Sequence, residues 1–134
     1  MTRIDEKTVE RSNLEKFAML SFDFDSYKIN NRAEKMINLI GESITNDASG
    51  VTVNGYCDST GTVDYNQALS ESRAQEAIKA LRALSHIPAN INVEGYGIRD
   101  PKFPNRLAEG RMLNRRVEVD IQKSNRQILS LIHI

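Results

Sequence analysis

The residues whose types and spacing could bind a charged ligand lie between positions 58 and 73. Asp58 follows a predicted strand at its carboxyl end, where open sheets with helical crossovers tend to place their sites. Asn66 and Arg73 follow on a predicted helix, and because they are seven residues apart they share one face of it. A turn containing Gly61 would let Asp58 fold back beside the start of this helix. An acid, an amide and a guanidinium would then line one rim.

An aspartate and an arginine on one rim suit a zwitterionic ligand. A carboxylate pairs with an ammonium group, and a guanidinium binds a carboxylate through two parallel hydrogen bonds. Two structural alternatives stay open: Asp58 and Arg73 could pair with each other, or Asp58 could cap the turn that follows it. Because short polar patterns often match by chance, spacing alone favours these alternatives.

A second cluster of charge precedes the last predicted strand. Arg111, Arg115 and Arg116 could clamp an anion, or they could form an exposed basic edge. They could also form salt bridges to acids such as Asp58 or Glu118. Strand alternation places Arg115 on the apolar face of the strand and Arg116 on the opposite face. Because an inward-facing arginine needs a partner, Arg115 is the better candidate for a site.

Other reactive groups are sparse. Cys57 is the only cysteine, and alternation places it on the buried side of its strand, so we expect a small core residue rather than a nucleophile. The two histidines, His86 and His133, are far apart in sequence. Asp23 and Asp25 share one strand face, which a solvated strand edge explains more simply than acid–base chemistry. We therefore expect no catalytic residue, no metal site and no cofactor.

Composition restricts the classes of function further. The chain has 134 residues, with 18 Lys and Arg against 18 Asp and Glu. This zero net charge argues against a nucleic-acid partner or an acidic membrane surface, which normally require a basic excess. Apolar residues make up 40% of the chain, enough for the core of one domain. No apolar run approaches the ~18 residues of a membrane span, and the first residues do not read as a signal peptide.

Periodicity predicts the elements that position these residues. Alternation of apolar and polar residues predicts four strands, and helical spacing predicts two helices that begin at capping boxes led by Asn31 and Asp64. Pro88 ends the second helix, and residues 97–113 are expected to form a long loop. The predicted strands cover residues 20–25, 51–57, 91–95 and 117–121.

The order of these elements predicts an α+β fold, a two-layer sandwich with the order β-α-β-α-β-β. Because every strand alternates, we expect one mixed sheet with both helices on one face and a polar opposite face. The strands joined through helices should run parallel, and the last strand antiparallel. We divide the chain into a lead-in segment 1–17, a domain 18–122 and a tail 123–134. The apolar end of that tail is either a strand that docks a partner or, as we favour, an artificial extension.

Three motifs in order resemble the OmpA-like C-terminal domain family, which includes Pal and MotB type members. That family typically shows GHTD, a short glycine turn and N-x-x-L-S-x-x-R-A. Here the corresponding residues are Gly55-Tyr-Cys-Asp58, the Gly61 turn and Asn66-Gln-Ala-Leu-Ser-Glu-Ser-Arg-Ala74. The segments 95–97 and 110–117 are similar to the second signature of the family, and 22–25 looks like its opening strand. The resemblance covers residues 18–122.

The resemblance implies a function as well as a fold. Members of the family bind peptidoglycan non-covalently in the periplasm, through the diaminopimelate of the stem peptide, and so anchor an outer-membrane or envelope protein to the cell wall. By resemblance, Asp58 would take the ammonium group of diaminopimelate and Arg73 its carboxylate. The residues that would line the rest of the site are Asn66, Thr60, Leu69, Arg115, Phe24 and Asp25.

Two other functions stay open at this point. One is a periplasmic protein-interaction module with the same fold and no cell-wall ligand, and the other is a hydrolase with Asp58 as its base, which lacks a second convergent carboxylate. The chain departs from the family at Tyr56-Cys57, where His-Thr is commoner, so contacts at the rim should differ. Envelope proteins are further possible partners, and we expect membrane attachment only through parts absent from this chain.

Overall fold

Four strands and three helices alternate along the chain in a computed structural model that describes residues 16–44, 48–84, 87–88, 90–99 and 101–123. The expectations for residues 1–15, for His86 and His133 and for the apolar tail fall outside the described residues. None of the described helices is both long and apolar enough to cross a bilayer. The elements are β1 (Lys16–Ser21), α2 (Asn31–Ser43), β2 (Ala48–Gly55), α3 (Val63–Leu84), β3 (Ile91–Gly95), α4 (Ala108–Asn114) and β4 (Arg116–Lys123).

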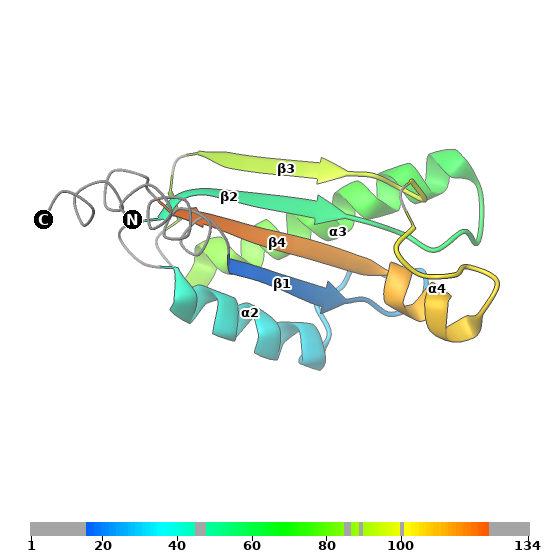
Figure 1. Cartoon of the computed structure of the whole chain (residues 1–134), viewed down its shortest axis with the longest axis horizontal. Coiled ribbons are helices and arrows are strands. Elements are labelled where there is room, and N and C mark those ends of the chain that lie inside the picture. The colour runs from blue at the N-terminus through cyan, green and yellow to red at the C-terminus, as the bar shows by residue number, and fades with distance from the viewer. Residues whose placement is uncertain (1–15, 45–47, 85–86, 89, 100, 124–134) are drawn as a thin grey trace, which may run out of the picture.

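The strands form one mixed sheet in the order β1-β4-β2-β3 (Figure 1). β2 and β3 are parallel, whereas β4 lies between β1 and β2 and is antiparallel to both. β1, β2 and β3 therefore run in one direction, each joined to the next through a helix. This confirms the predicted α+β fold, with a mixed sheet and an antiparallel last strand.

The core lies between the sheet and the two long helices, which both pack on one face of it. The apolar residues of α3 recur at helical spacing, and those in its middle, from Leu69 to Leu81, are buried against the sheet. Ala68 and Leu84, which continue the same spacing at its two ends, are exposed. The side chains that fill this layer are Leu20, Val51, Val53, Val117, Val119 and Ile121 from the sheet, Ala33, Ile37 and Ile40 from α2, and Ala74, Ala77, Ile78 and Leu81 from α3.

The first strand differs from its prediction. It covers Lys16–Ser21 rather than 20–25. Beyond it, the backbone carbonyls of Asp23 and Ser26 accept hydrogen bonds from the Arg73 side chain, which draws the chain away from the sheet. The alternation predicted over 20–25 therefore continues past the point where a tertiary contact ends the strand.

Both predicted capping boxes are wrong in position. The α2 cap is Asn30, whose side chain accepts from the Ala33 N–H at 2.8 Å. At α3 the hydroxyl of Thr62 accepts from the Tyr65 N–H at 3.2 Å, and Asp64 lies in the first turn. Several polar residues precede each helix, and the local pattern does not distinguish which of them adopts the cap geometry.

The segment 97–113 is not a continuous loop, because it contains the helix α4. Glycines and prolines in this stretch favoured a loop, but Gly110 lies inside the helix, where a side chain would collide with the backbone of Pro104. The buried side chain of Asn114 then holds the preceding loop, bonding both backbone groups of Phe103 and the Asn105 side chain. A short helix held by such distant contacts leaves little periodic signal in the sequence.

The helix α3 packs closely on β2, and a glycine permits this approach. A Cβ atom at Gly55 would collide with the backbone carbonyl of Ser70 on α3. The end of β2 is thereby held against the first half of α3, so the turn after β2, with Asp58, lies close to the helix that carries Arg73.

We predict that Gly55→Ala lowers the free energy of unfolding by about 1–3 kcal/mol, because the added methyl group forces the backbone of β2 and α3 apart. Urea denaturation measures the effect. Gly50→Ala is the matched control at the other end of the same strand, where the closest neighbour is the flexible Gln122 side chain. An equal loss in both variants would contradict the close-packing interpretation.

Candidate functional site

A cavity of about 410 Å³ opens where β2 ends, between the start of α3 and the segment that follows β1. Cys57, Gly61 and Tyr65 also contribute to its wall. The structure thus brings together all of the predicted site residues, although they come from four separate parts of the chain. The predicted residues that line the cavity are Phe24, Asp25, Asp58, Thr60, Asn66, Leu69, Arg73 and Arg115.

Asp58 lies almost buried in this cavity, with 4% of its surface exposed. One carboxylate oxygen accepts from the Thr60 N–H at 2.8 Å, and the other pairs with Arg115 at 3.2 Å. Burial by itself raises the pKa of Asp58, but the hydrogen bonds from Thr60 and Arg115 outweigh burial and hold the pKa below its ordinary value. Asp58 is therefore a fixed negative charge at neutral pH.

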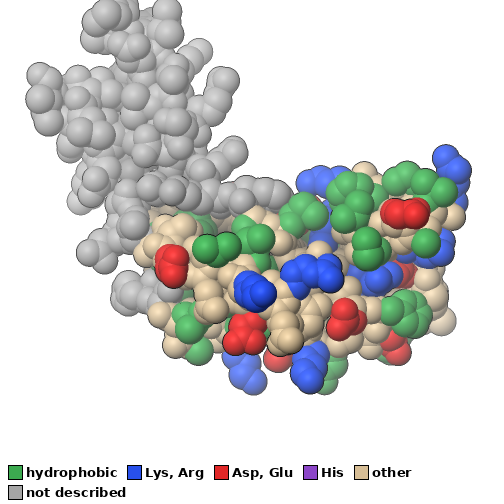
Figure 2. All heavy atoms as spheres, turned by 90° about the horizontal axis from the view of Figure 1, so that it is seen from below, with side chains coloured by type: hydrophobic (Ala, Val, Ile, Leu, Met, Phe, Trp, Pro, Cys, Tyr) green, Lys and Arg blue, Asp and Glu red, His purple; other side chains and the backbone are tan. Residues whose placement is uncertain are grey.

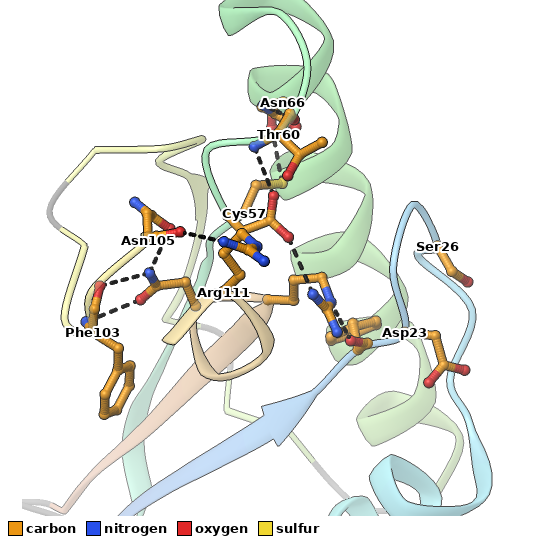
Figure 3. A network of polar contacts seen from close by, with 12 residues as sticks. Asp23, Ser26, Cys57, Thr60, Asn66, Phe103, Asn105 and Arg111 are labelled. Atoms are coloured by element: carbon orange, nitrogen blue, oxygen red, sulfur yellow. Dashed lines mark hydrogen bonds and ion pairs between the residues drawn. The ribbon is translucent and has the colours of Figure 1, made fainter. Parts of the chain in front are cut away.

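The turn after Asp58 is held by the first part of α3. The Asn66 side-chain amide donates to the Thr60 carbonyl at 2.7 Å, and the Asn66 backbone carbonyl accepts from the Cys57 thiol at 3.3 Å. Figure 3 shows the labelled Cys57, Thr60 and Asn66 close together on this side of the site. Asn66 thus positions the turn, and the turn positions Asp58.

Arg73 is the largest side chain with no exposed surface, and it connects β2 to the segment after β1. Its Nε donates to the Ser26 carbonyl at 2.7 Å and its Nη2 to the Asp23 carbonyl at 3.0 Å. Its Nη1 donates to the Tyr56 carbonyl at 3.0 Å and contacts the Cys57 sulfur at 3.5 Å. Burial lowers the pKa of Arg73, yet a guanidinium stays charged at pH 7.

The predicted alternative in which Asp58 and Arg73 pair with each other is wrong. Among the described residues, Asp58 forms its ion pair with Arg115, and Arg73 forms none with a carboxylate. The other alternative is correct in part, because Asp58 does cap its turn through Thr60. Arg73 is therefore a buried cation that backbone carbonyls solvate; Asp58 and Asp25 are near enough to favour its charge, but neither forms a direct ion pair with it.

The three arginines near the start of β4, Arg111, Arg115 and Arg116, do not form a common clamp. Arg115, the cap residue of α4 just before β4, lies on the predicted side and lines the cavity, and it pairs with Asp58, one of the alternatives left open for this cluster. Arg111 donates instead to a backbone carbonyl of the preceding loop. Arg116 points to the other face of the sheet, where it pairs with Glu118 at 2.7 Å. Only one of the three guanidiniums reaches the site.

Two exposed aromatic residues lie at the mouth of the cavity. Phe24 is 61% exposed, and the Arg115 guanidinium lies 5.9 Å from the centre of its ring. The Tyr65 hydroxyl donates to the Asp25 carboxylate, and Asp25 has the left-handed backbone conformation, with a φ of 52°. Sequence reasoning missed Tyr65, although an aromatic residue directly before Asn66 could have indicated it.

Cys57 behaves as the predicted small core residue. It is 4% exposed, and burial raises the pKa of its thiol to about 11, although the nearby Arg73 opposes this effect. A thiol with such a pKa is almost entirely protonated at neutral pH and is a poor nucleophile. Within the described ranges, no group of three or more His, Cys, Asp and Glu side chains could hold a metal ion.

A family model and several curated relatives match this chain. The model of the OmpA family matches residues 21–115. Outer membrane porin F of Pseudomonas aeruginosa is 35% identical over 105 residues, which cover 77% of this chain and 30% of the porin. The peptidoglycan-associated lipoprotein of the same organism is 25% identical over 116 residues, covering 87% of this chain and 69% of that protein. The chain thus spans less than a third of the porin's length.

A solved structure supports the same assignment of the fold. The C-terminal domain of Helicobacter pylori MotB superposes with a TM-score of 0.71 and is 27% identical, covering 87% of this chain and 92% of that domain. Domains of the matched family bind ligands and are not enzymes. The low pKa of Asp58 agrees with this, because a strongly ionised carboxylate is a weak general base.

We predict that Asp58→Asn lowers the free energy of unfolding at pH 7 by about 1–3 kcal/mol, since it removes the charge that pairs with Arg115. The folded-state pKa of Asp58 lies below its unfolded value. The stability it contributes is therefore complete above about pH 4 and is lost as the pH falls through the folded pKa. Urea denaturation across this range should show the deficit shrinking in acid. Glu42→Gln, exposed on α2, is the control; a deficit independent of pH would refute the assignment.

Proposed function

Because the chain belongs to the OmpA family, we propose that it binds bacterial peptidoglycan non-covalently through the diaminopimelate residue of the stem peptide. The names of its relatives, outer membrane porin F and peptidoglycan-associated lipoprotein, support a place in the periplasm next to the outer membrane. The domain would anchor an envelope protein to the cell wall, and attachment to the membrane would depend on other parts of that protein.

The observation that supports this ligand most is the buried guanidinium of Arg73, which has no direct ion pair among the described residues. A carboxylate that pairs directly with a buried cation gains more than one that pairs with an exposed arginine. The four hydrogen bonds of Arg73 leave one of its five N–H groups, on Nη2, for a ligand. The 3.5 Å contact from Nη1 to Cys57 is the weakest of the four and the easiest to exchange. A carboxylate could then take one N–H from each terminal nitrogen.

The rest of the cavity fits the other end of the zwitterion. The free end of diaminopimelate carries an ammonium group and a carboxylate on one carbon atom. Asp58, ionised and turned into the same cavity as Arg73, would accept from the ammonium group. Leu69 and Phe24 supply apolar wall beside these charges, suited to the methylene chain of the ligand.

We predict that a muropeptide with diaminopimelate binds and that one with lysine at the same position binds far more weakly. Lysine retains the ammonium group but lacks the terminal carboxylate, so Arg73 would gain no counter-ion. Isothermal titration calorimetry with the two muropeptides measures the difference. Equal affinities would rule out Arg73 as the carboxylate site.

We also predict that Arg73→Lys weakens muropeptide binding by about 1–3 kcal/mol, because lysine retains the charge but not the planar pair of donors. Asp58→Ala should cost at least as much, since the ligand ammonium would lose its countercharge. Affinity is measured by calorimetry and stability by thermal melting of the same variants.

Stability needs its own control here, because Arg73 also holds three backbone carbonyls. Ile78→Val removes one methyl group from the core, away from the cavity, and should lower stability with unchanged affinity. If Arg73→Lys behaved like Ile78→Val, Arg73 would only support the fold. If the chain as given then also failed to bind purified peptidoglycan, a protein-interaction module would be the better description of the fold.

A further inference from the structure

A groove of about 560 Å³ lies on the side of the molecule formed by α3 and β3, apart from the cavity around Asp58. Three glutamates line it, Glu71 and Glu76 from α3 and Glu94 from β3, and no lysine or arginine does. Of the described basic residues, none forms an ion pair with these three. The groove therefore carries uncompensated negative charge.

The strand that borders this groove is an edge of the sheet. Among the described strands, β3 pairs only with β2. The Asn90 carbonyl accepts from the Val51 N–H of β2, and the Tyr96 N–H donates to the Gly55 carbonyl of β2. In and beside β3, the even-numbered residues therefore direct their backbone N–H and C=O groups toward β2. The backbone groups of Ile91 and Val93 must then point outward.

The outward groups differ in their partners. The Gly95 carbonyl is occupied, since it accepts from the Gln67 side chain at 2.7 Å. The N–H and C=O groups of Ile91 and Val93 have no hydrogen-bond partner in the described part of the chain. They form a short row of donors and acceptors that an extended segment could pair with.

We propose that the β3 edge, the open strand Ile91–Gly95 with its acidic groove, binds an extended basic segment of a partner protein by strand addition. Main-chain hydrogen bonds to Ile91 and Val93 would set the register. Alternate side chains of the added strand would then enter the groove, where lysine or arginine would meet Glu71 and Glu76 of α3. Glu94, which alternation places on the opposite face of β3, would attract basic side chains on that face.

A basic segment fits this edge better than a second copy of the chain or a metal ion would. A second copy of the chain would bring an identical acidic edge, and like charges directly opposite each other are destabilising. The glutamates are not gathered tightly enough to hold a metal ion, since no such cluster occurs within the described residues. On the face that carries α2, positive and negative side chains are intermingled (Figure 2), so that face has no comparable preference for a basic segment.

The test uses the whole chain and a short blocked peptide of alternating lysine and valine, with a glutamate–valine peptide as the control. Amide hydrogen exchange is followed by NMR. The basic peptide should protect the amides of Ile91 and Val93, while those of Asn92 and Glu94, already bonded to β2, should change little. The acidic peptide should protect neither pair. Protection elsewhere, or none with the basic peptide, would overturn the proposal.

Two variants separate the backbone and charge contributions. Val93→Pro removes an outward N–H without breaking the ladder to β2, and proline is tolerated on sheet edges in that orientation. Reversing Glu71, Glu76 and Glu94 to lysine should weaken peptide binding by about tenfold or more, whereas Glu34→Lys with Glu42→Lys on α2 should not. Unchanged peptide binding in Val93→Pro or in the triple variant would refute strand addition at this edge.

Measurements of muropeptide affinity and of oligomeric state complete the design. Muropeptide affinity should be the same in Val93→Pro as in the parent chain, which shows that the fold is intact and separates this inference from the proposed function. Sedimentation of the parent chain should show a monomer. A dimer that Val93→Pro abolishes would assign the edge to a second copy of the chain and overturn the basic partner.

Discussion

The buried guanidinium of Arg73 is the interaction on which the site depends. Arg73 donates hydrogen bonds to the backbone carbonyls of Asp23, Ser26 and Tyr56, and so fixes the segment after β1 against the end of β2. The first strand ends where it does because this side chain captures the carbonyls beyond it. Together with the hydrogen bond from Tyr65 to Asp25 and the contact of Arg115 with the Phe24 ring, Arg73 holds this segment at the mouth of the cavity.

The charged side chains of the cavity do not all pair with one another. Carbonyl dipoles solvate Arg73, but the carboxylate beside it is already paired with Arg115. The cavity lining thus carries two guanidiniums, Arg73 and Arg115, and two carboxylates, the buried Asp58 and the exposed Asp25, so its charges balance. Hydrogen bonds from Thr60 and Arg115 keep Asp58 ionised, which makes the cavity suitable for a zwitterion rather than for acid–base catalysis.

Close packing of α3 on the sheet holds the site residues of β2, the following turn and α3 in fixed positions. Gly55 lets the end of β2 meet the first turns of α3, and Asn66 on that helix ties down the turn that carries Asp58. At the β3 edge of the same sheet, the described structure pairs the strand on one side, with β2. There, within the described part of the chain, the backbone groups of Ile91 and Val93 have no partner and lie beside a groove lined by three glutamates, the edge at which we propose that a basic segment binds.

The sequence by itself determined the fold class, the packing stripe of α3 and the residues that gather in the cavity. Alternation and helical periodicity report burial, and the motif from Asp58 to Arg73 keeps its spacing along one strand, turn and helix. It did not determine where β1 ends, which residues cap α2 and α3, that α4 exists, or that Asp58 pairs with Arg115 rather than Arg73. The end of β1 and the partner of Asp58 depend on contacts between residues about fifty positions apart, which a local pattern does not report. The caps and α4 depend on which of several nearby polar groups adopts the required geometry, and the folded chain decides that choice.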